Sequence, residues 1–162
     1  MRNWGWKAIL LFLTIICNDA SLVSAQTLKR LSFNEYEMAM AKEPKPAFIF
    51  IRTAWCSYCK RMDHSTLKNK GIINRLNKTF YFVEFDAERK SDITFWNRVY
   101  KYKATGLEIG VHELAEELGH IDGVLAYPTI VLINEELEII YRQVGYISIR
   151  QFSALLDRIE GL

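Results

Sequence analysis

Two apolar runs stand out in the middle of the chain. Residues 46–52, PAFIFIR, are almost continuously apolar and begin at the second of two closely spaced prolines. A short run of this kind predicts a strand that is buried on both faces of a sheet. Residues 79–86, TFYFVEFD, are aromatic and alternate with polar side chains, which predicts a second strand.

Apolar residues at helical spacing predict helices around these strands. Asn34 is the expected N-cap of the first helix, and Pro44 lies beyond its end. The predicted helical segments are 33–42, 57–67 and 71–77, and the second carries Cys59, Met62 and Thr66 along one face.

The middle of the chain departs from this simple alternation. Residues 92–103, DITFWNRVYKYK, are rich in aromatic and β-branched side chains, which favours a hairpin that turns near Asn97. Gly106 and Gly110 then indicate a loop. Residues 111–118, VHELAEEL, predict a short helix whose glutamates form a solvated face, and the glycine that follows ends it.

The last third predicts a strand, a turn, a second strand and an amphipathic helix. The strands cover 127–134, with Pro128 near the start, and 137–144, and Ser148 is the expected cap of the helix. We expect the first two strands to be parallel and the last two to form a hairpin. The chain is therefore predicted to be an α/β protein with a central mixed sheet, flanking helices and an inserted segment at about 88–110.

Composition adds limits to this picture. A chain of 162 residues, half of them apolar, suits one domain with its own core. The formal net charge of +2 lacks the concentrated positive charge of a nucleic-acid-binding protein. We expect a globular monomer with no nucleic-acid partner.

The N-terminus has the pattern of a secretory signal peptide. A basic start precedes an apolar run over residues 8–17, and small side chains follow before Ala25. The run is shorter than the roughly 20 residues that span a bilayer, which disfavours a membrane anchor. We predict a signal peptide over 1–25, a mature domain over 26–162, and export to the periplasm or cell envelope. Retention by an uncleaved segment is the alternative.

Export leaves two cysteines in the mature chain, because Cys17 leaves with the signal peptide. A bridge between Cys56 and Cys59 closes almost no loop and so restricts the unfolded chain very little. Exported domains that are stabilised by disulfides normally carry several bridges. A purely structural disulfide is therefore a weaker explanation than a redox-active dithiol.

A metal site is the remaining alternative for the cysteines. Cys56, Cys59 and His64 could begin one, with His112 or His120 to complete it. The histidine spacing matches no common zinc pattern, and there is no second pair of closely spaced cysteines. We expect neither a metal nor a cofactor, and we interpret His112 and His120 as surface or capping residues.

The position of the cysteines predicts their chemistry. A cysteine that follows a buried strand and starts a helix lies near unpaired backbone N–H groups and the positive end of the helix dipole. Both favour the thiolate and bring a cysteine pKa from roughly 8.5 into the ~3.5–7.5 range. Lys60 and Arg61 add positive charge nearby. Cys56 is the predicted attacking sulfur, and Cys59 resolves the mixed disulfide.

These motifs resemble a known family. WCSYCK after a buried strand, YPT about seventy residues later, a hairpin and a final helix are similar to the thioredoxin superfamily over residues 33–160. Within it, the chain resembles exported bacterial thioredoxin-like proteins and the C-terminal domain of the electron transporter DsbD. The resemblance implies a three-layer thioredoxin-like fold and a thiol–disulfide oxidoreductase.

The resemblance also implies a substrate site and partners. Pro128 would be cis and lie beside the cysteines, the backbone of Tyr127 would pair with an extended substrate segment, and Trp55 would flank the site. The implied partners are exported proteins with thiols or disulfides and a membrane electron donor or acceptor.

Three features depart from the family pattern. Phe50 occupies the position of a buried acid that handles the proton of Cys59, so water, Glu84 or Asp86 would have to replace it. The inserted segment at about 88–110 is longer than a plain thioredoxin needs and is a candidate lip that selects the partner. The third departure lies between the cysteines.

Ser57 and Tyr58 match neither the Gly-Pro of reducing thioredoxins nor the Pro-His of strong oxidants. The redox potential is therefore not predictable from them, although we expect Ser57, Tyr58 and Lys60 to support the site. We favour a reductase or electron carrier over an oxidase or isomerase. A redox-inert peptide-binding module, acting as a chaperone or assembly factor, is the alternative from another class.

Overall fold

The structure, a computed structural model, describes residues 26–161. A mixed sheet forms its centre, and its strands are, in spatial order, β2 (Tyr81–Asp86), β1 (Ala47–Arg52), β7 (Thr129–Ile133) and β8 (Ile139–Val144). β1 runs parallel to β2 and antiparallel to β7, and β7 forms a hairpin with β8. The predicted pairing of the sheet is confirmed.

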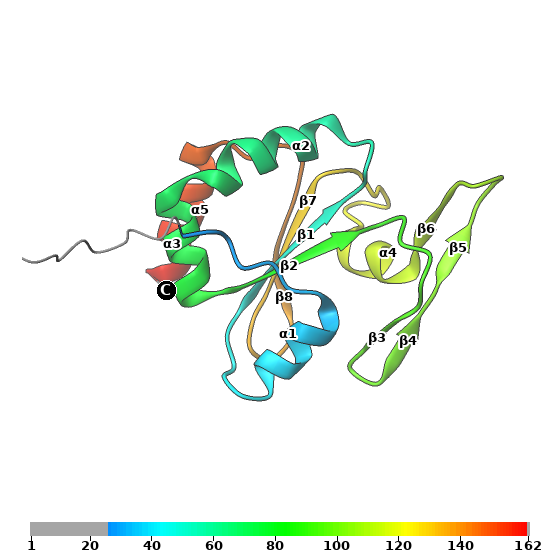
Figure 1. The fold of residues 1–162 in the computed structure, drawn as a ribbon, viewed down its shortest axis with the longest axis horizontal. Helices are drawn as coiled ribbons and strands as arrows, with labels where there is room; N and C mark the ends of the chain where they lie inside the picture. The colour runs from blue at the N-terminus through cyan, green and yellow to red at the C-terminus, as the bar shows by residue number, and fades with distance from the viewer. Residues whose placement is uncertain (1–25, 162) are drawn as a thin grey trace, which may run out of the picture.

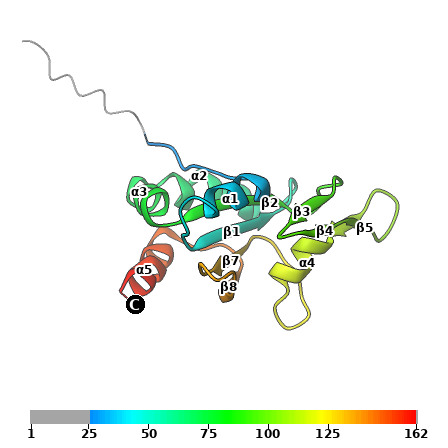
Figure 2. The ribbon, with the colours of Figure 1, turned by 90° about the horizontal axis from the view of Figure 1, so that it is seen from below.

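Helices cover both faces of this sheet (Figures 1 and 2). One face is covered by α2 (Ser57–His64), α3 (Lys70–Thr79) and α5 (Ile149–Glu160), and the other by α1 (Phe33–Met40) and α4 (Glu113–Gly119). The predicted three-layer α/β fold is therefore confirmed.

β1 supplies side chains to both cores. Phe48 and Phe50 pack under α2, α3 and α5, whereas Ile49 and Ile51 pack under α1 and α4. All four side chains are fully buried, as the continuous apolar run predicts. The central strand is thus fixed by apolar burial on both sides, and it carries the chain to the cysteines.

Side-chain caps define the first and last helices. Ser32 caps α1, because it has extended backbone geometry and exchanges hydrogen bonds with Glu35 in a capping box. The prediction of Asn34 as the cap is wrong, since that residue already lies in the first turn. Ser148 caps α5 as predicted, in a second capping box with Gln151.

α2 is shorter than the helix predicted over 57–67. It ends at His64, where Ser65 leaves helical geometry, and a short 3-10 helix, η1 (Thr66–Lys68), follows. The predicted buried face is confirmed, because Cys59, Met62 and Thr66 are all fully buried.

The inserted segment forms two hairpins. The first joins β3 (Ile93–Phe95) to β4 (Arg98–Tyr100) and turns at Trp96 and Asn97, which confirms the predicted hairpin. The second joins β5 (Tyr102–Ala104) to β6 (Gly110–His112), where we predicted a loop and the start of a helix. α4 consequently begins at Glu113 rather than at residue 111.

Close packing explains why Gly110 belongs to a strand. A Cβ atom at this position would lie 2.2 Å from the carbonyl oxygen of Lys103 and 2.5 Å from the Tyr102 ring. Only glycine lets the two strands approach so closely. We interpreted Gly110 as a loop signal, whereas its absent side chain serves strand pairing.

The glutamates of α4 do not form the free solvated face that we predicted. Glu117 accepts a hydrogen bond from the Tyr100 hydroxyl at 2.9 Å, and Glu116 accepts one from Lys103 Nζ at 2.9 Å. Glu113 accepts a third from the backbone N–H of Lys101, also at 2.9 Å. These carboxylates hold the inserted hairpins against the helix.

The predicted signal peptide lies outside the described residues and stays a prediction. Over residues 26–161, each helix is too short or too polar to cross a membrane.

Candidate active site

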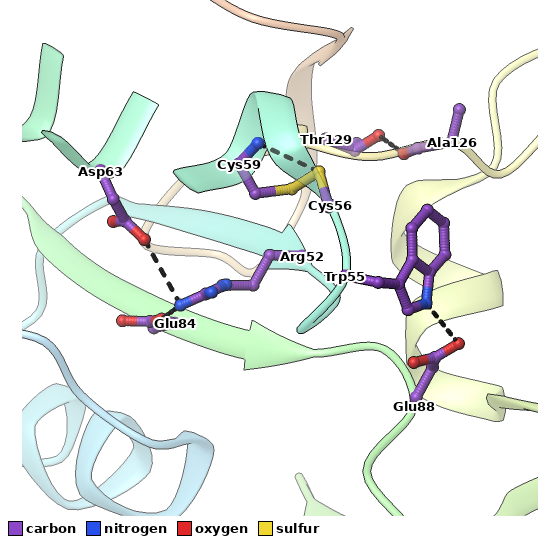
Figure 3. The surroundings of a disulfide bond; sticks show 9 residues. All are labelled: Arg52, Trp55, Cys56, Cys59, Asp63, Glu84, Glu88, Ala126 and Thr129. Atoms are coloured by element: carbon purple, nitrogen blue, oxygen red, sulfur yellow. Dashed lines mark hydrogen bonds and ion pairs between the residues drawn. A yellow bond between two sulfur atoms is a disulfide. The ribbon is translucent and has the colours of Figure 1, made fainter. Parts of the chain in front are cut away.

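Cys56 and Cys59 form a disulfide at the start of α2 (Figure 3). The S–S distance is 2.06 Å, and the Cα atoms lie 5.2 Å apart. The strand–helix junction places them: β1 ends at Arg52, and the N–H of Cys56 then donates to the carbonyl of Thr53 at 3.3 Å. This turn brings the chain directly from a buried strand to the N-cap of a helix.

The two sulfurs have different surroundings. Cys56 is the N-cap of α2, and its Sγ accepts a hydrogen bond from the N–H of Cys59 at 3.0 Å. It retains 4% of its surface exposed, whereas Cys59 has none and packs beside Met62 in the core under α2. A thiolate at Cys56 would accept the same hydrogen bond and lie at the positive end of the helix dipole. The geometry therefore makes Cys56 the more accessible and better stabilised sulfur.

The loop before β7 lies beside the disulfide. Thr129 pairs with Ile51 at the end of β1, so Pro128 stands next to the strand that leads to the cysteines. The Tyr127–Pro128 peptide bond is cis, the form that the family resemblance implies. The hydroxyl of Thr129 donates to the carbonyl of Ala126 at 2.6 Å, which closes the turn (Figure 3).

Trp55 connects this loop to the inserted segment. Its ring packs edge-on against Tyr127, with ring centroids 5.9 Å apart, and it is 64% exposed. Its indole N–H donates to Glu88 Oε1 at 2.9 Å (Figure 3). The structure therefore brings together Trp55, Tyr127 and Pro128, as predicted, and adds Glu88. No sequence pattern indicates Glu88, apart from its place at the start of the insertion.

The predicted supporting residues surround the first turn of α2. Ser57, Tyr58 and Lys60 are all exposed there. Tyr58 exposes 58% of its surface, so two large aromatic side chains next to the cysteines in sequence, Trp55 and Tyr58, are exposed. Such exposed aromatic side chains are typical of protein-binding surfaces.

Comparison with known proteins identifies the fold family. A family model described as a thioredoxin-like domain matches residues 33–160. The chain belongs to the thioredoxin-like family. A search of the curated proteins found no match.

Solved structures agree with this assignment. A putative disulphide isomerase from Bacteroides thetaiotaomicron is 25% identical, with a TM-score of 0.55 over 84% of this chain and 94% of that one. A thioredoxin-fold protein from Helicobacter pylori is also 25% identical, with a TM-score of 0.55 over 80% and 72%. A disulphide isomerase from Xylella fastidiosa Temecula1 shares the fold at 17% identity, with a TM-score of 0.53 over 91% and 98%. The thioredoxin-like fold and the bonded cysteine pair together support thiol–disulfide exchange.

The region where the family pattern has a buried acid is apolar in this thioredoxin-like domain. Phe50 is fully buried, and its ring centroid lies 6.1 Å from that of Phe82. Next to it on the same face, four charged side chains pair with one another. The Arg30 guanidinium pairs with Asp63 at 2.8 Å and with Glu84 at 2.5 Å. The Arg52 guanidinium pairs with the same two carboxylates, with Glu84 at 2.6 Å and with Asp63 at 3.3 Å.

This charge cluster sets the protonation of Glu84. Burial alone would raise the pKa of Glu84, but the hydrogen bonds from Arg30 and Arg52 outweigh burial, so the pKa lies below its ordinary value. Glu84 is therefore a weak base at neutral pH. Asp86 is exposed and accepts a hydrogen bond from the N–H of Glu88 at 3.0 Å. Glu84 therefore lacks the raised pKa that a proton carrier near neutral pH needs.

The structure does not support the metal alternative. His112 is fully buried and caps α4, where its Nδ1 accepts a hydrogen bond from Leu114 at 3.3 Å. His120 is exposed at the other end of that helix. Over residues 26–161, no three histidine, cysteine or acidic side chains are grouped so that they could hold an ion. The interpretation of His112 as a capping residue is confirmed.

Proposed function

We propose that this protein exchanges dithiols and disulfides with exported protein substrates in the periplasm or cell envelope. The observation that carries the proposal is the Cys56–Cys59 disulfide at the N-terminus of α2, in which Cys56 keeps 4% of its surface exposed and Cys59 none. The family and the neighbouring Tyr127–Pro128 turn support it.

The reduced protein would act in two steps. The Cys56 thiolate attacks one sulfur of a substrate disulfide, the substrate S–S bond breaks, and the other substrate sulfur leaves as a thiolate that takes up a proton. The Cys59 sulfur, as a thiolate, then attacks Cys56 Sγ and releases the second substrate thiol. The substrate gains two electrons and two protons, and the protein ends with the Cys56–Cys59 disulfide.

The surface beside the cysteines would position the substrate. An extended substrate segment would pair with the backbone at Tyr127, before Pro128, as in strand addition. Trp55 and Tyr58 would supply apolar contact on either side, because both rings are exposed next to the disulfide. The pairing would hold the substrate sulfur in line with Cys56.

Water is the proposed proton acceptor for Cys59. Phe50 provides no base, and the arginines keep Glu84 weakly basic. A cavity of about 760 Å³ opens beside the charge cluster and is lined by Arg52, Ala54 and Glu84, among others. The cavity brings solvent to the charge cluster, although neither cysteine lines it.

The proposed direction of electron flow is reduction of substrates, with a membrane protein as the electron donor. A redox titration of the Cys56–Cys59 pair against glutathione tests this direction. A potential near about −270 mV would support a reductase, and one near about −120 mV would overturn that direction while leaving exchange itself intact.

The decisive test compares insulin reduction by the wild type and by Cys56→Ser. The substitution removes the attacking thiolate, so we expect turnover to fall at least roughly a thousandfold, to the uncatalysed rate. Cys59→Ser keeps the attacking sulfur and should accumulate a covalent mixed disulfide through Cys56. Equal turnover by wild type and Cys56→Ser would support a redox-inert binding module instead.

A further inference from the structure

The β5–β6 hairpin is anchored at the strand end that carries the cysteines. The N–H of His112 donates to the carbonyl of Ala87 at 2.7 Å, and the N–H of Ala87 donates to the carbonyl of Arg52 at 2.8 Å. Arg52 is the last residue of β1, just before the turn to Cys56. Figures 1 and 2 both show the hairpin projecting from the same end of the sheet as the start of α2.

The tip of this hairpin presents two apolar side chains to solvent. Leu107 is 95% exposed and Ile109 is 65% exposed. The backbone around them is closed, because the N–H groups of Thr105 and Gly106 both donate to the carbonyl of Ile109, at 2.8 and 3.1 Å. Hairpin turns are normally polar, so large apolar side chains at a tip that covers no core indicate a contact surface.

The hairpin is braced against α4. Lys103 Nζ bonds to Glu116 at 2.9 Å, and Glu113 accepts a hydrogen bond from the N–H of Lys101 at 2.9 Å. The close approach of the strands at Gly110 fixes their pairing. The tip is therefore presented from a supported element rather than from an isolated loop.

The reach of the hairpin distinguishes large partners from small ones. Leu107 and Ile109 lie about three to five residues beyond His112, which at roughly 3.3 Å per residue places them about 10–17 Å from the base. A protein partner covers about 800 Å² of surface, a patch roughly 30 Å across. Such a partner can contact the tip while its disulfide lies at Cys56, whereas a small disulfide cannot.

We propose that the β5–β6 hairpin is a docking arm through which Leu107 and Ile109 bind apolar segments of polypeptide substrates whose disulfide is at Cys56. This inference rests on the proposed function. The occupant follows from continuity, because the base of the arm bonds to Ala87, and the next residue, Glu88, accepts the indole hydrogen bond of the exposed Trp55. The substrate class is a polypeptide with apolar side chains exposed beside its disulfide, as in an incompletely folded protein.

A lipid surface fits the tip less well than a polypeptide. Glu108 lies between the two apolar residues and is exposed. Its carboxylate would be repelled by anionic lipid headgroups and costly to insert below them. A polypeptide segment can leave that carboxylate in water while it covers Leu107 and Ile109.

The test compares two disulfide probes in single turnovers of the reduced protein. Scrambled ribonuclease A is the polypeptide probe, and 5,5′-dithiobis(2-nitrobenzoate) is the small one. For Leu107→Ser/Ile109→Ser we expect the second-order rate constant to fall about tenfold with ribonuclease, the loss expected for two apolar contact residues. With the small disulfide it should change less than about twofold.

Two matched variants control for nonspecific effects. Met38→Ser/Ile140→Ser removes two other exposed apolar side chains, one from α1 and one from the end of β8 far from the cysteines. Their surfaces are 52% and 53% exposed, and this variant should leave both rates unchanged. Leu107→Met/Ile109→Val keeps the arm apolar and should retain the ribonuclease rate.

Each other outcome has a definite meaning. Equal losses on both probes, or no loss on ribonuclease, would overturn the docking arm. A ribonuclease loss of the same size in Met38→Ser/Ile140→Ser would overturn it as well. If the wild type and Cys56→Ser react equally slowly with both probes, the proposed function fails instead.

Discussion

The dithiol turn and the β5–β6 hairpin leave the sheet at the same end but are held by different forces. The dithiol turn is continuous with β1 and with the core under α2, so apolar burial fixes it from below. The hairpin has few buried side chains, and a hydrogen bond to Glu113 and an ion pair to Glu116 of α4 hold it in place. The chemistry is thus built on the rigid part of the molecule.

This difference indicates which substitutions should change substrate specificity. A reacting sulfur must be held to within a fraction of an ångström, which a packed core provides. A contact arm needs only to present its side chains, so exposed polar bonds are sufficient to hold it. Substitutions near the cysteines should therefore affect stability and exchange, and those in the hairpins mainly partner choice.

The largest contrast is expected from truncation in the two regions. Phe50→Ala removes a fully buried ring beneath the dithiol and should lower the free energy of unfolding by about 3–5 kcal/mol. Leu107→Ala, at the tip of the β5–β6 hairpin with 95% of its surface exposed, should change it by less than about 0.5 kcal/mol. Guanidinium denaturation of the oxidised proteins measures both. Similar losses at the two sites would contradict the contrast.

A smaller effect is expected at the charge cluster beside Phe50. Glu84→Gln leaves Arg30 and Arg52 with one fewer carboxylate and should cost about 1–3 kcal/mol at neutral pH. The folded pKa of Glu84 lies below its unfolded value. The carboxylate therefore contributes fully to the free energy of unfolding above about pH 4.3, and this contribution is lost as the pH falls through the folded pKa.

Unfolding curves of the wild type and Glu84→Gln from pH 7 to pH 3 test this directly. The stability difference between the two proteins should be constant near neutrality and should shrink in acid. A difference that grows as the pH falls would show that Glu84 is not stabilised as a carboxylate.

The same contrast explains what the sequence could predict. The sheet, the cysteine-bearing helix start and the final helix follow from apolar patterning, because burial of Ile49 and Phe50 on opposite faces leaves a continuous apolar run. The site around Trp55, Tyr127 and Pro128 required more than patterning. It came from the family resemblance, since no local pattern shows that the two loops meet.

The inserted segment was harder to predict for physical reasons. Its second hairpin depends on the missing side chain of Gly110, which in sequence is indistinguishable from a loop glycine. The α4 glutamates accept hydrogen bonds from the backbone N–H of Lys101 and from the side chain of Lys103, and helical spacing cannot reveal such partners. Glu88 was missed in the same way, because its role depends on the position of Trp55.

Glu88 tests whether the insertion acts on the dithiol turn. Glu88→Ala removes the acceptor for the Trp55 indole, an exposed hydrogen bond worth about 0.5–1 kcal/mol. We expect the rate constant for exchange with insulin to fall about two- to fivefold, and the unfolding midpoint to fall by only a few degrees. Glu88→Gln retains an acceptor and should keep most of the rate. If both variants match the wild type, Trp55 is positioned by Tyr127 alone.

The smallest effect is expected for the ion pairs that brace the hairpin. Lys103→Met removes the bond to Glu116, but Lys103 is more than half exposed, so solvent and salt already weaken the pair. The global unfolding midpoint should not change measurably. Amide hydrogen exchange in β5 and β6 should speed up several-fold, because the brace stabilises the hairpin locally. Glu43→Gln, which breaks an exposed pair with Lys45 far from the hairpin, should leave that exchange unchanged. Faster exchange throughout the sheet of Lys103→Met would instead mean that the hairpin is part of the cooperative core.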